Sequence, residues 1–189
     1  MKIGLYFGSF NPIHQGHLII AQHILNFAGL NEIWFVVSPQ NPFKNESSLL
    51  EASHRLFLVR AAIDAVPGFK ASNVEFSLPK PSYTIHTLTY LKEQYPNHQF
   101  SIIMGSDGFQ NIDKWKNGDF IINQYPVLVY ERPGFPFINK DGLDVSRVNA
   151  PFLDISSTMI RKMIKEKKSI RFLVPDAVME LIESNLFYR

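Results

Sequence analysis

The chain has 189 residues, of which 46% are hydrophobic, and a formal net charge of +2. This length suits one well-packed domain, and so small a net charge argues against a nucleic-acid partner. Because the sequence has no cysteine, no leader peptide and no run long enough to span a bilayer, we expect a cytoplasmic protein without disulfides or a membrane segment.

The first predicted elements are a short apolar strand at 3–7 and a helix that starts near residue 14 and runs to about 28, because its apolar residues recur at helical spacing. A strand-to-helix turn directs backbone N–H groups and the positive end of the helix dipole at one point, which suits a phosphate. Gly8 and Gly16 let the backbone approach a ligand closely. His14 and His17 lie on one face of the helix start and can donate hydrogen bonds there.

Two histidines at this spacing could also be a metal pair or ordinary surface residues. Zinc sites need three or four ligands, commonly with cysteine among them, and no third ligand follows at a suitable spacing. The dinucleotide pattern Gly-x-Gly-x-x-Gly is also missing from the sequence, which argues against a hydride-transfer enzyme. We therefore interpret the turn as an anion site and expect no metal ligands in it.

A second buried strand is predicted at 33–37, and strand, helix and strand at this spacing indicate a parallel βαβ unit. The loop at 39–46 leaves the carboxyl end of that strand. Ligands collect at this edge in open α/β sheets, so Lys44 is placed to meet a phosphate, although a loop lysine can also be merely solvated.

The pattern of Ser48 and Glu51 is typical of a capping box and predicts a helix over 48–66. Charged residues on a helix usually face solvent. We therefore interpret Arg55 and Arg60 as solvent-facing charges.

An alternating pattern at 74–78 predicts the third strand. The proline-rich loop at 79–84 then delivers Ser82 or Thr84 as the N-cap of a helix that runs to about residue 95. Capping is the simplest role for Thr84.

Further strands are predicted at 100–104 and 127–129, with a short last one at 145–148. Asp107 closely follows the first of these, where a carboxylate can accept from a ribose hydroxyl or cap the next helix. Trp115 can stack on an aromatic base or a pyridine ring, or pack in the core. The sequence leaves both pairs of alternatives open.

A second polar turn begins a helix near the C-terminus. Three hydroxyl residues stand there in a row, and an arginine follows about one turn into the helix; they are Ser156, Ser157, Thr158 and Arg161. One hydroxyl is enough for capping, so this set favours a second phosphate-binding turn. After a last helix at 175–185, the alternation of elements predicts an α/β fold, with a Rossmann-like, doubly wound and mainly parallel sheet flanked by helices in one domain over 1–189.

Two motifs resemble those of the nucleotidyltransferase superfamily. They are Gly-x-Phe-x-Pro-x-His-x-Gly-His at 8–17 and Ile-Ser-Ser-Thr-x-Ile-Arg at 155–161. Three other features are similar to the nicotinate-nucleotide adenylyltransferase branch of that superfamily: Pro-Ser-Tyr-Thr at 81–84, Gly-Ser-Asp at 105–107 with Trp115, and Arg-Pro-Gly at 132–134. The sequence departs from the family's pattern at Ser9, Phe43 and Lys116.

The resemblance implies a role for each matching residue. It assigns catalysis to His14, His17, Lys44 and Arg161. It assigns ATP binding to Gly8, Ser9, Phe10, His14, Gly16, His17, Gly105, Asp107, Ile155, Ser156, Ser157, Thr158 and Arg161, so that the part from about 156 to 189 completes the ATP site. It assigns the nicotinate nucleotide to Ser9, Lys44, Tyr83, Thr84, Trp115 and Arg132.

Neither a cysteine nor a Ser-His-Asp set is indicated as a nucleophile, and a phosphate monoester is already mostly dianionic near neutral pH, so it needs no general base. The resemblance implies that nicotinate mononucleotide attacks ATP, with Mg²⁺ bound through the ATP phosphates, to give nicotinate adenine dinucleotide and pyrophosphate in NAD biosynthesis. Nicotinamide mononucleotide or phosphopantetheine could be the acceptor instead, and a non-catalytic nucleotide-binding module is a further alternative. Neither a nucleic acid nor a membrane is an expected partner, and a homo-oligomer is left open.

Overall fold

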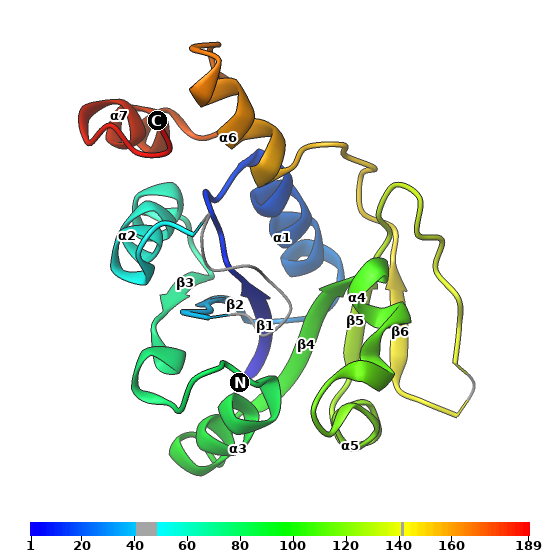
Figure 1. Ribbon diagram of the computed structural model, residues 1–189. Coiled ribbons are helices and arrows are strands. Elements are labelled where there is room, and N and C mark those ends of the chain that lie inside the picture. Colours follow the sequence, from blue (N-terminus) through cyan, green and yellow to red (C-terminus); the bar gives the residue numbers. More distant parts are fainter. Residues whose placement is uncertain (41–48, 141) are drawn as a thin grey trace.

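Strands and helices build one parallel sheet with helices on both of its faces (Figure 1). The computed structural model describes residues 1–40, 49–140 and 142–189. Its strands are β1 (Lys2–Gly8), β2 (Glu32–Val37), β3 (Phe69–Ser72), β4 (Gln99–Gly105), β5 (Val127–Tyr130) and β6 (Val145–Val148). Its helices are α1 (Gln15–Phe27), α2 (Ala52–Ile63), α3 (Thr84–Gln94), α4 (Ser106–Gln110), α5 (Gly118–Gln124), α6 (Ser157–Lys165) and α7 (Asp176–Ser184), with 3₁₀ turns η2 (Val74–Ser77) and η3 (Ile112–Lys114). Within these ranges, no helix is both long and apolar enough to cross a membrane.

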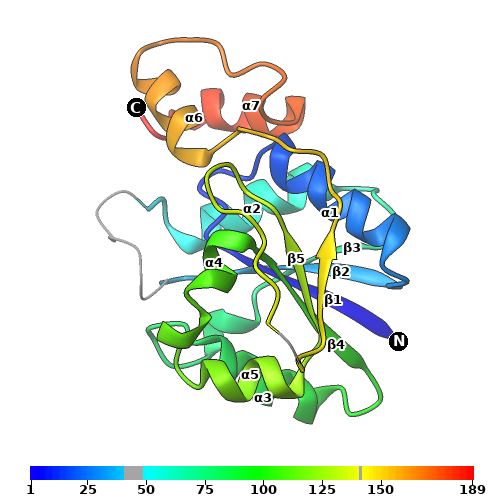
Figure 2. The same cartoon turned by 90° about the vertical axis from the view of Figure 1, so that its right-hand side faces the viewer.

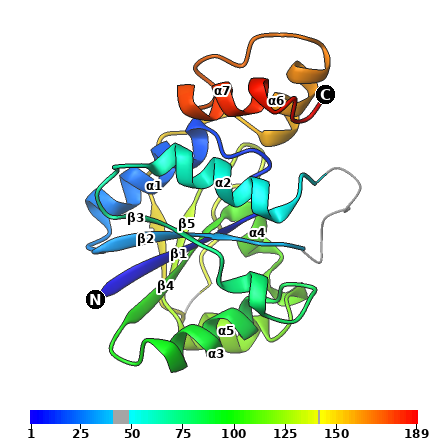
Figure 3. The same cartoon turned by 90° about the vertical axis from the view of Figure 1, so that its left-hand side faces the viewer.

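The strand order is β3-β2-β1-β4-β5-β6, and every neighbouring pair is parallel. The chain adds strands outward from β1 in one direction and from β4 in the other, so the order reverses between these two strands. Helices α1 and α2, with α6 and α7 beyond them, lie on one side of the sheet, and α3, α4 and α5 lie on the other (Figures 2 and 3). This confirms the predicted doubly wound sheet, whose crevice for ligands lies at the carboxyl ends of the strands beside the reversal.

Each central strand supplies both layers of the core. In β2, Ile33, Phe35 and Val37 pack with α1 and α2, whereas Trp34 and Val36 face the layer of α3 to α5. Successive side chains of a strand point to opposite faces, and a parallel sheet covered on both faces is apolar on both. This is why the strands read as continuous apolar runs in the sequence.

The strand predicted at 74–78 is wrong, because the third strand is β3 and residues 74–77 form η2. Glu75 explains the difference, since its side chain is only 2% exposed. The hydroxyl of Thr87 in α3 donates to Glu75 Oε1 over 2.8 Å. The segment therefore curls under α3, where Thr87 binds one oxygen of this carboxyl group, instead of extending along the sheet.

Two helix starts also differ from expectation. Helix α2 begins at Ala52 with Glu51 as its N-cap residue and no side-chain cap bond, and Ser48 lies outside the described residues. Helix α3 has Tyr83 at its N-cap, so neither Ser82 nor Thr84 caps it. A cap depends on backbone angles that residue type alone does not fix.

Candidate functional site

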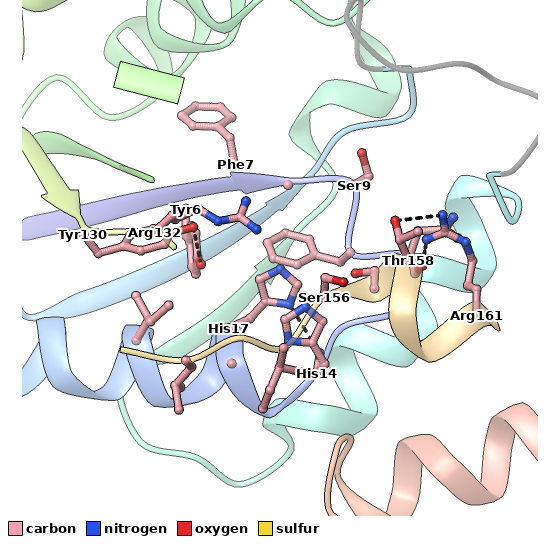
Figure 4. Close-up of a pocket in the computed structure, with 18 of the residues that line it drawn as sticks. Tyr6, Phe7, Ser9, His14, His17, Tyr130, Arg132, Ser156, Thr158 and Arg161 are labelled. Atoms are coloured by element: carbon pink, nitrogen blue, oxygen red, sulfur yellow. Dashed lines mark hydrogen bonds between the residues drawn. The ribbon is translucent and has the colours of Figure 1, made fainter. Parts of the chain in front are cut away.

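A cavity of about 540 Å³ opens where β1 and β5 end, between the starts of α1 and α6 (Figure 4). The predicted site residues that line it are Gly8, Ser9, Phe10, His14, Gly16, His17, Arg132, Ile155, Ser156, Ser157, Thr158 and Arg161. The structure thus brings the two polar turns together, as the sheet topology predicts. Lys44 lies outside the described residues, so its place near the cavity stays a prediction.

The two histidines of the first turn are stacked face to face. His14 is the N-cap residue of α1, and its ring centroid lies 3.7 Å from that of His17. The backbone N–H of His14 donates to Nδ1 of His17 over 3.3 Å, while the ring of His17 meets Phe10 edge-on at 5.1 Å. Both imidazoles are therefore held in fixed orientations at the mouth of a helix N-terminus.

Burial sets the charge of His14, whose residue surface is 5% exposed. Desolvation, helped by the positive charge of Arg132, lowers the pKa of His14 from 6.5 to about 4. His14 is therefore neutral at pH 7 and can offer a ligand a hydrogen bond but no positive charge. Its Nδ1 atom is buried without a hydrogen-bond partner among the described residues.

Gly8 and Gly16 leave room for the rings of Phe10 and His14. A Cβ atom on Gly8 would lie 2.8 Å from the ring of Phe10, and one on Gly16 would lie 3.0 Å from Nδ1 of His14. Phe10 itself has a positive φ of 45°, a conformation that non-glycine residues seldom adopt. The turn therefore needs glycine at positions 8 and 16, because the rings of Phe10 and His14 occupy the space that a Cβ atom would take.

The hydroxyl groups of Ser156 and Ser157, at the start of α6, have different hydrogen-bond partners. Ser156 caps the helix, since its Oγ accepts from the backbone N–H of Met159 over 3.2 Å. Ser157 Oγ donates to the carbonyl oxygen of Pro12 over 2.9 Å. One hydroxyl thus serves the helix and another ties α6 to the first turn.

The third hydroxyl, on Thr158, holds Arg161. Arg161 donates from Nη2 to Thr158 Oγ1 over 3.3 Å and from Nη1 to the carbonyl oxygen of Asn11 over 2.8 Å. Figure 4 shows Ser156 beside the histidine pair, with Thr158 and Arg161 farther along α6. The guanidinium group therefore bridges the two turns at the edge of the cavity.

An ion pair joins Asp107, in the first turn of α4, to Arg132, which follows β5. Arg132 Nη1 lies 3.1 Å from Asp107 Oδ2, and the two side chains are 43% and 36% exposed. The backbone N–H of Arg132 donates to Ser106 Oγ over 2.9 Å, and a Cβ on Gly105 would meet both charged side chains. Asp107 does not cap α4, so of its two predicted roles capping is wrong.

Three residues predicted to bind the pyridine nucleotide lie apart from the cavity lining of the described chain: Tyr83, Thr84 and Trp115. Tyr83 faces the Nζ of Lys116, which lies 4.7 Å from the ring centroid and 3.3 Å from Nε2 of His86. Trp115 is half-buried against the core under α3 to α5. They line the α3 side of the sheet, across from the histidines.

Sequence reasoning missed Arg55. The prediction that it faces solvent is wrong, because it is 1% exposed, whereas Arg60 is exposed as predicted. The helix period does not separate the two arginines, because Arg55 stands four residues before the buried Val59 and Arg60 stands four residues after the buried Leu56.

A buried pair of tyrosines also went unpredicted. Tyr6 donates its hydroxyl to the hydroxyl of Tyr130 over 3.1 Å, and burial raises the pKa of each phenol. The ring of Tyr6 lies 6.0 Å from that of His17. The pair forms part of the cavity wall beneath the histidine, and its members are 124 residues apart, so no local pattern links them.

Comparisons with known proteins agree with this arrangement. Residues 5–163 match the family model described as cytidylyltransferase-like. A protein of Cytophaga hutchinsonii, named "Probable nicotinate-nucleotide adenylyltransferase", is 50% identical over 190 residues, which cover 100% of this chain and 98% of that protein. The nicotinate-nucleotide adenylyltransferase of Bacillus subtilis is 38% identical over 187 residues, covering 99% of this chain and 98% of that protein.

Solved structures share the fold. Plasmodium falciparum nicotinic acid mononucleotide adenylyltransferase complexed with NaAD superimposes with a TM-score of 0.80 at 24% identity, covering 99% of this chain and 97% of that one. The same enzyme complexed with APC gives a TM-score of 0.79 at 24% identity, covering 99% and 96%. With its two matching motifs around one cavity and relatives that align over their full length, this chain belongs to the cytidylyltransferase-like family, among the nicotinate-nucleotide adenylyltransferases.

Proposed function

We propose that this chain transfers the adenylyl group of ATP to nicotinate mononucleotide, giving nicotinate adenine dinucleotide and pyrophosphate in the biosynthesis of NAD. One observation carries the proposal: the starts of α1 and α6 meet at a single cavity, although the hydrogen bonds that join them link residues 145 and 150 positions apart. Two helix N-termini aimed at one space suit a polyphosphate. The names of the full-length relatives supply the acceptor.

The chemistry needs alignment more than activation. The phosphate of the mononucleotide attacks the α-phosphorus of ATP in line, a new P–O bond forms, and the bond to the β-phosphate oxygen breaks as pyrophosphate leaves. His14 and His17 donate to the triphosphate, and Arg161 balances the charge that grows on the leaving group. We assign the same task to Lys44 from the sequence. No proton has to be removed from the attacking phosphate.

The acceptor would occupy the α3 side of the sheet. We assign the nucleotide part to Arg132, which lines the cavity, and the pyridine ring to Tyr83, Thr84 and Trp115. Tyr83 and Thr84 stand at the start of α3, and Trp115 packs against the core on that side of the sheet. An acceptor bound there would bring its phosphate to the reversal point of the sheet, next to the triphosphate.

We propose that Mg²⁺ arrives on the phosphate oxygens of ATP. Mg²⁺ is commonly bound through one or two carboxylates together with substrate phosphates, and groups of three or more His, Asp or Glu side chains that could hold a metal ion do not occur among the described residues. We assign no step of the reaction to protein ligands of a metal.

The test is an assay of pyrophosphate release with ATP and each of three acceptors: nicotinate mononucleotide, nicotinamide mononucleotide and phosphopantetheine. We expect the highest kcat/KM with nicotinate mononucleotide. A preference for either of the others would contradict the assigned acceptor. Release with none of them, by a folded protein that still binds ATP, would indicate a binding module without turnover.

A further inference from the structure

The buried guanidinium group of Arg55, on α2, donates its hydrogen bonds within the described residues to backbone oxygens. It donates from Nη1 to the carbonyl oxygens of Ser9 and Ser38, over 2.5 and 2.8 Å. It also donates from Nη2 to Pro39 O over 3.0 Å and from Nε to Leu50 O over 2.8 Å. Four of the five N–H donors of this fork bind carbonyl oxygens and so fix the path of the chain.

These carbonyl oxygens belong to three segments that surround the candidate site. Ser9 follows β1, Ser38 and Pro39 follow β2, and Leu50 precedes α2. The last ladder bond between the two strands runs from the N–H of Ser38 to the oxygen of Gly8, over 2.9 Å. Arg55 therefore joins the segments that follow β1 and β2, at the point where the hydrogen bonds between these strands end.

The first turn is held from its other side as well. Asn11 Oδ1 accepts from the N–H of Leu50 over 3.1 Å, and the carbonyl oxygen of Asn11 accepts from Arg161 over 2.8 Å. Leu50 thus connects the buried arginine to the turn a second time. Residues 9–11 are thus held between the buried guanidinium group of Arg55 and the guanidinium group of Arg161 at the edge of the cavity.

The hydrogen bond from Arg55 to Ser9 O also constrains the direction of the N–H group of Phe10. In a trans peptide the C=O and the N–H point in opposite directions, so the bond from Arg55 to Ser9 O turns the N–H of Phe10 away from Arg55. Ser9 and Phe10 line the cavity, and Arg55 is not part of its lining. The N–H of Phe10 therefore points away from Arg55, in a turn whose residues line the cavity.

We propose that Arg55 is a positioning residue for adenylyl transfer, which fixes the turn after β1 against the end of β2 so that its N–H groups and His14 are aligned with the triphosphate. This inference rests on the proposed function. Arginine suits the task because its planar group carries five donors in a rigid fork, whereas lysine offers three donors from a single atom. Lysine can keep the charge but cannot reach all four oxygens.

The test compares R55K and R55M with R60M, a matched control in which an exposed arginine of the same helix is changed. Pyrophosphate release with ATP and nicotinate mononucleotide is measured per folded protein, with melting temperatures recorded alongside. We expect kcat of R55K and R55M to fall about 100-fold, since a misplacement of about 1 Å can cost that much, and KM for both substrates to change less than about threefold. R60M should match the wild type.

Rescue of kcat by added guanidinium ion is a second measurement, and it would not be expected if Arg55 had a purely structural role. Added to R55A, it should restore part of kcat, and methylammonium should not. The inference is overturned if kcat of R55K stays within about twofold of the wild type, or if activity falls only in step with the folded fraction. If R55M and R55A do not fold, R55K decides by the same criterion. A wild-type protein without turnover would refute the proposed function, and the inference with it; wild-type turnover equalled by R55K would refute the inference alone.

Discussion

Protonation of His14 is expected to destabilise the folded chain in mild acid. Burial and the charge of Arg132 lower its pKa from 6.5 to about 4, so the unfolded chain binds a proton more tightly at this position than the folded chain does. Unfolding therefore becomes easier as the pH falls from about 6.5 towards 4, and this effect levels off below 4. Above 6.5 the imidazole is neutral in both states and contributes nothing.

The size of the effect follows from the two pKa values. At about 1.4 kcal/mol for each pH unit between them, the difference between 6.5 and about 4 corresponds to about 3 kcal/mol of unfolding free energy. Between pH 7 and pH 5 the linkage relation gives a loss of about 2 kcal/mol. This is a large part of the stability of a typical domain.

The assay is urea denaturation of the wild type and of His14→Gln at pH 7 and at pH 5. The variant shifts stability by a constant amount at both values, and other titrating groups act alike in both proteins. The loss between the two pH values should therefore be about 2 kcal/mol larger in the wild type. Equal losses in the two proteins would refute the argument that His14 is buried and neutral.

Three further substitutions probe the site. His17→Ala should lower kcat about 100-fold or more, as removal of one donor to the reacting phosphates commonly does; near-full turnover by a folded variant would contradict its assignment. Ser157→Ala removes the hydrogen bond to Pro12 O and should lower the unfolding free energy by about 1 kcal/mol in urea denaturation, so an unchanged midpoint would show that the bond contributes nothing in solution. Asp107→Asn removes the ion pair with Arg132, and because both side chains are substantially exposed, the unfolding free energy should change by less than about 1 kcal/mol. The KM for ATP should rise about tenfold if the carboxylate accepts a hydrogen bond from ATP. An unchanged KM would remove Asp107 from the ATP site.

The two polar turns were predictable because their geometry is local. A helix start is fixed by a few neighbouring residues, so the spacing of His14 and His17 and the run of hydroxyl residues before Arg161 sufficed to indicate them. Their meeting at one cavity then followed from the doubly wound sheet, since the carboxyl ends of parallel strands lie at one edge. Local pattern and topology together thus predicted that the two turns line one cavity.

What sequence reasoning missed depends on partners that are distant in the chain. Val74 and Phe76 alternate as in a strand, yet the buried carboxyl group of Glu75 between them has its partner on α3. Arg55 looks like any helix charge until the carbonyl oxygens of the loops beyond β1 and β2 surround it. Such contacts are chosen by tertiary packing, which propensity and periodicity do not encode.

The hydrogen bonds from Ser157 and Arg161 to the first turn also govern when the cavity can exist during translation. Pro12 and Asn11 leave the ribosome about 150 residues before the side chains that bind their carbonyl oxygens, and contacts so distant form late in folding. The pairing of β1 with β2 can proceed on the nascent chain, since domains begin to assemble from the N-terminal side. A product that terminates just before α6 would therefore carry all six strands but could not close around a triphosphate, so such an incomplete chain would not sequester ATP.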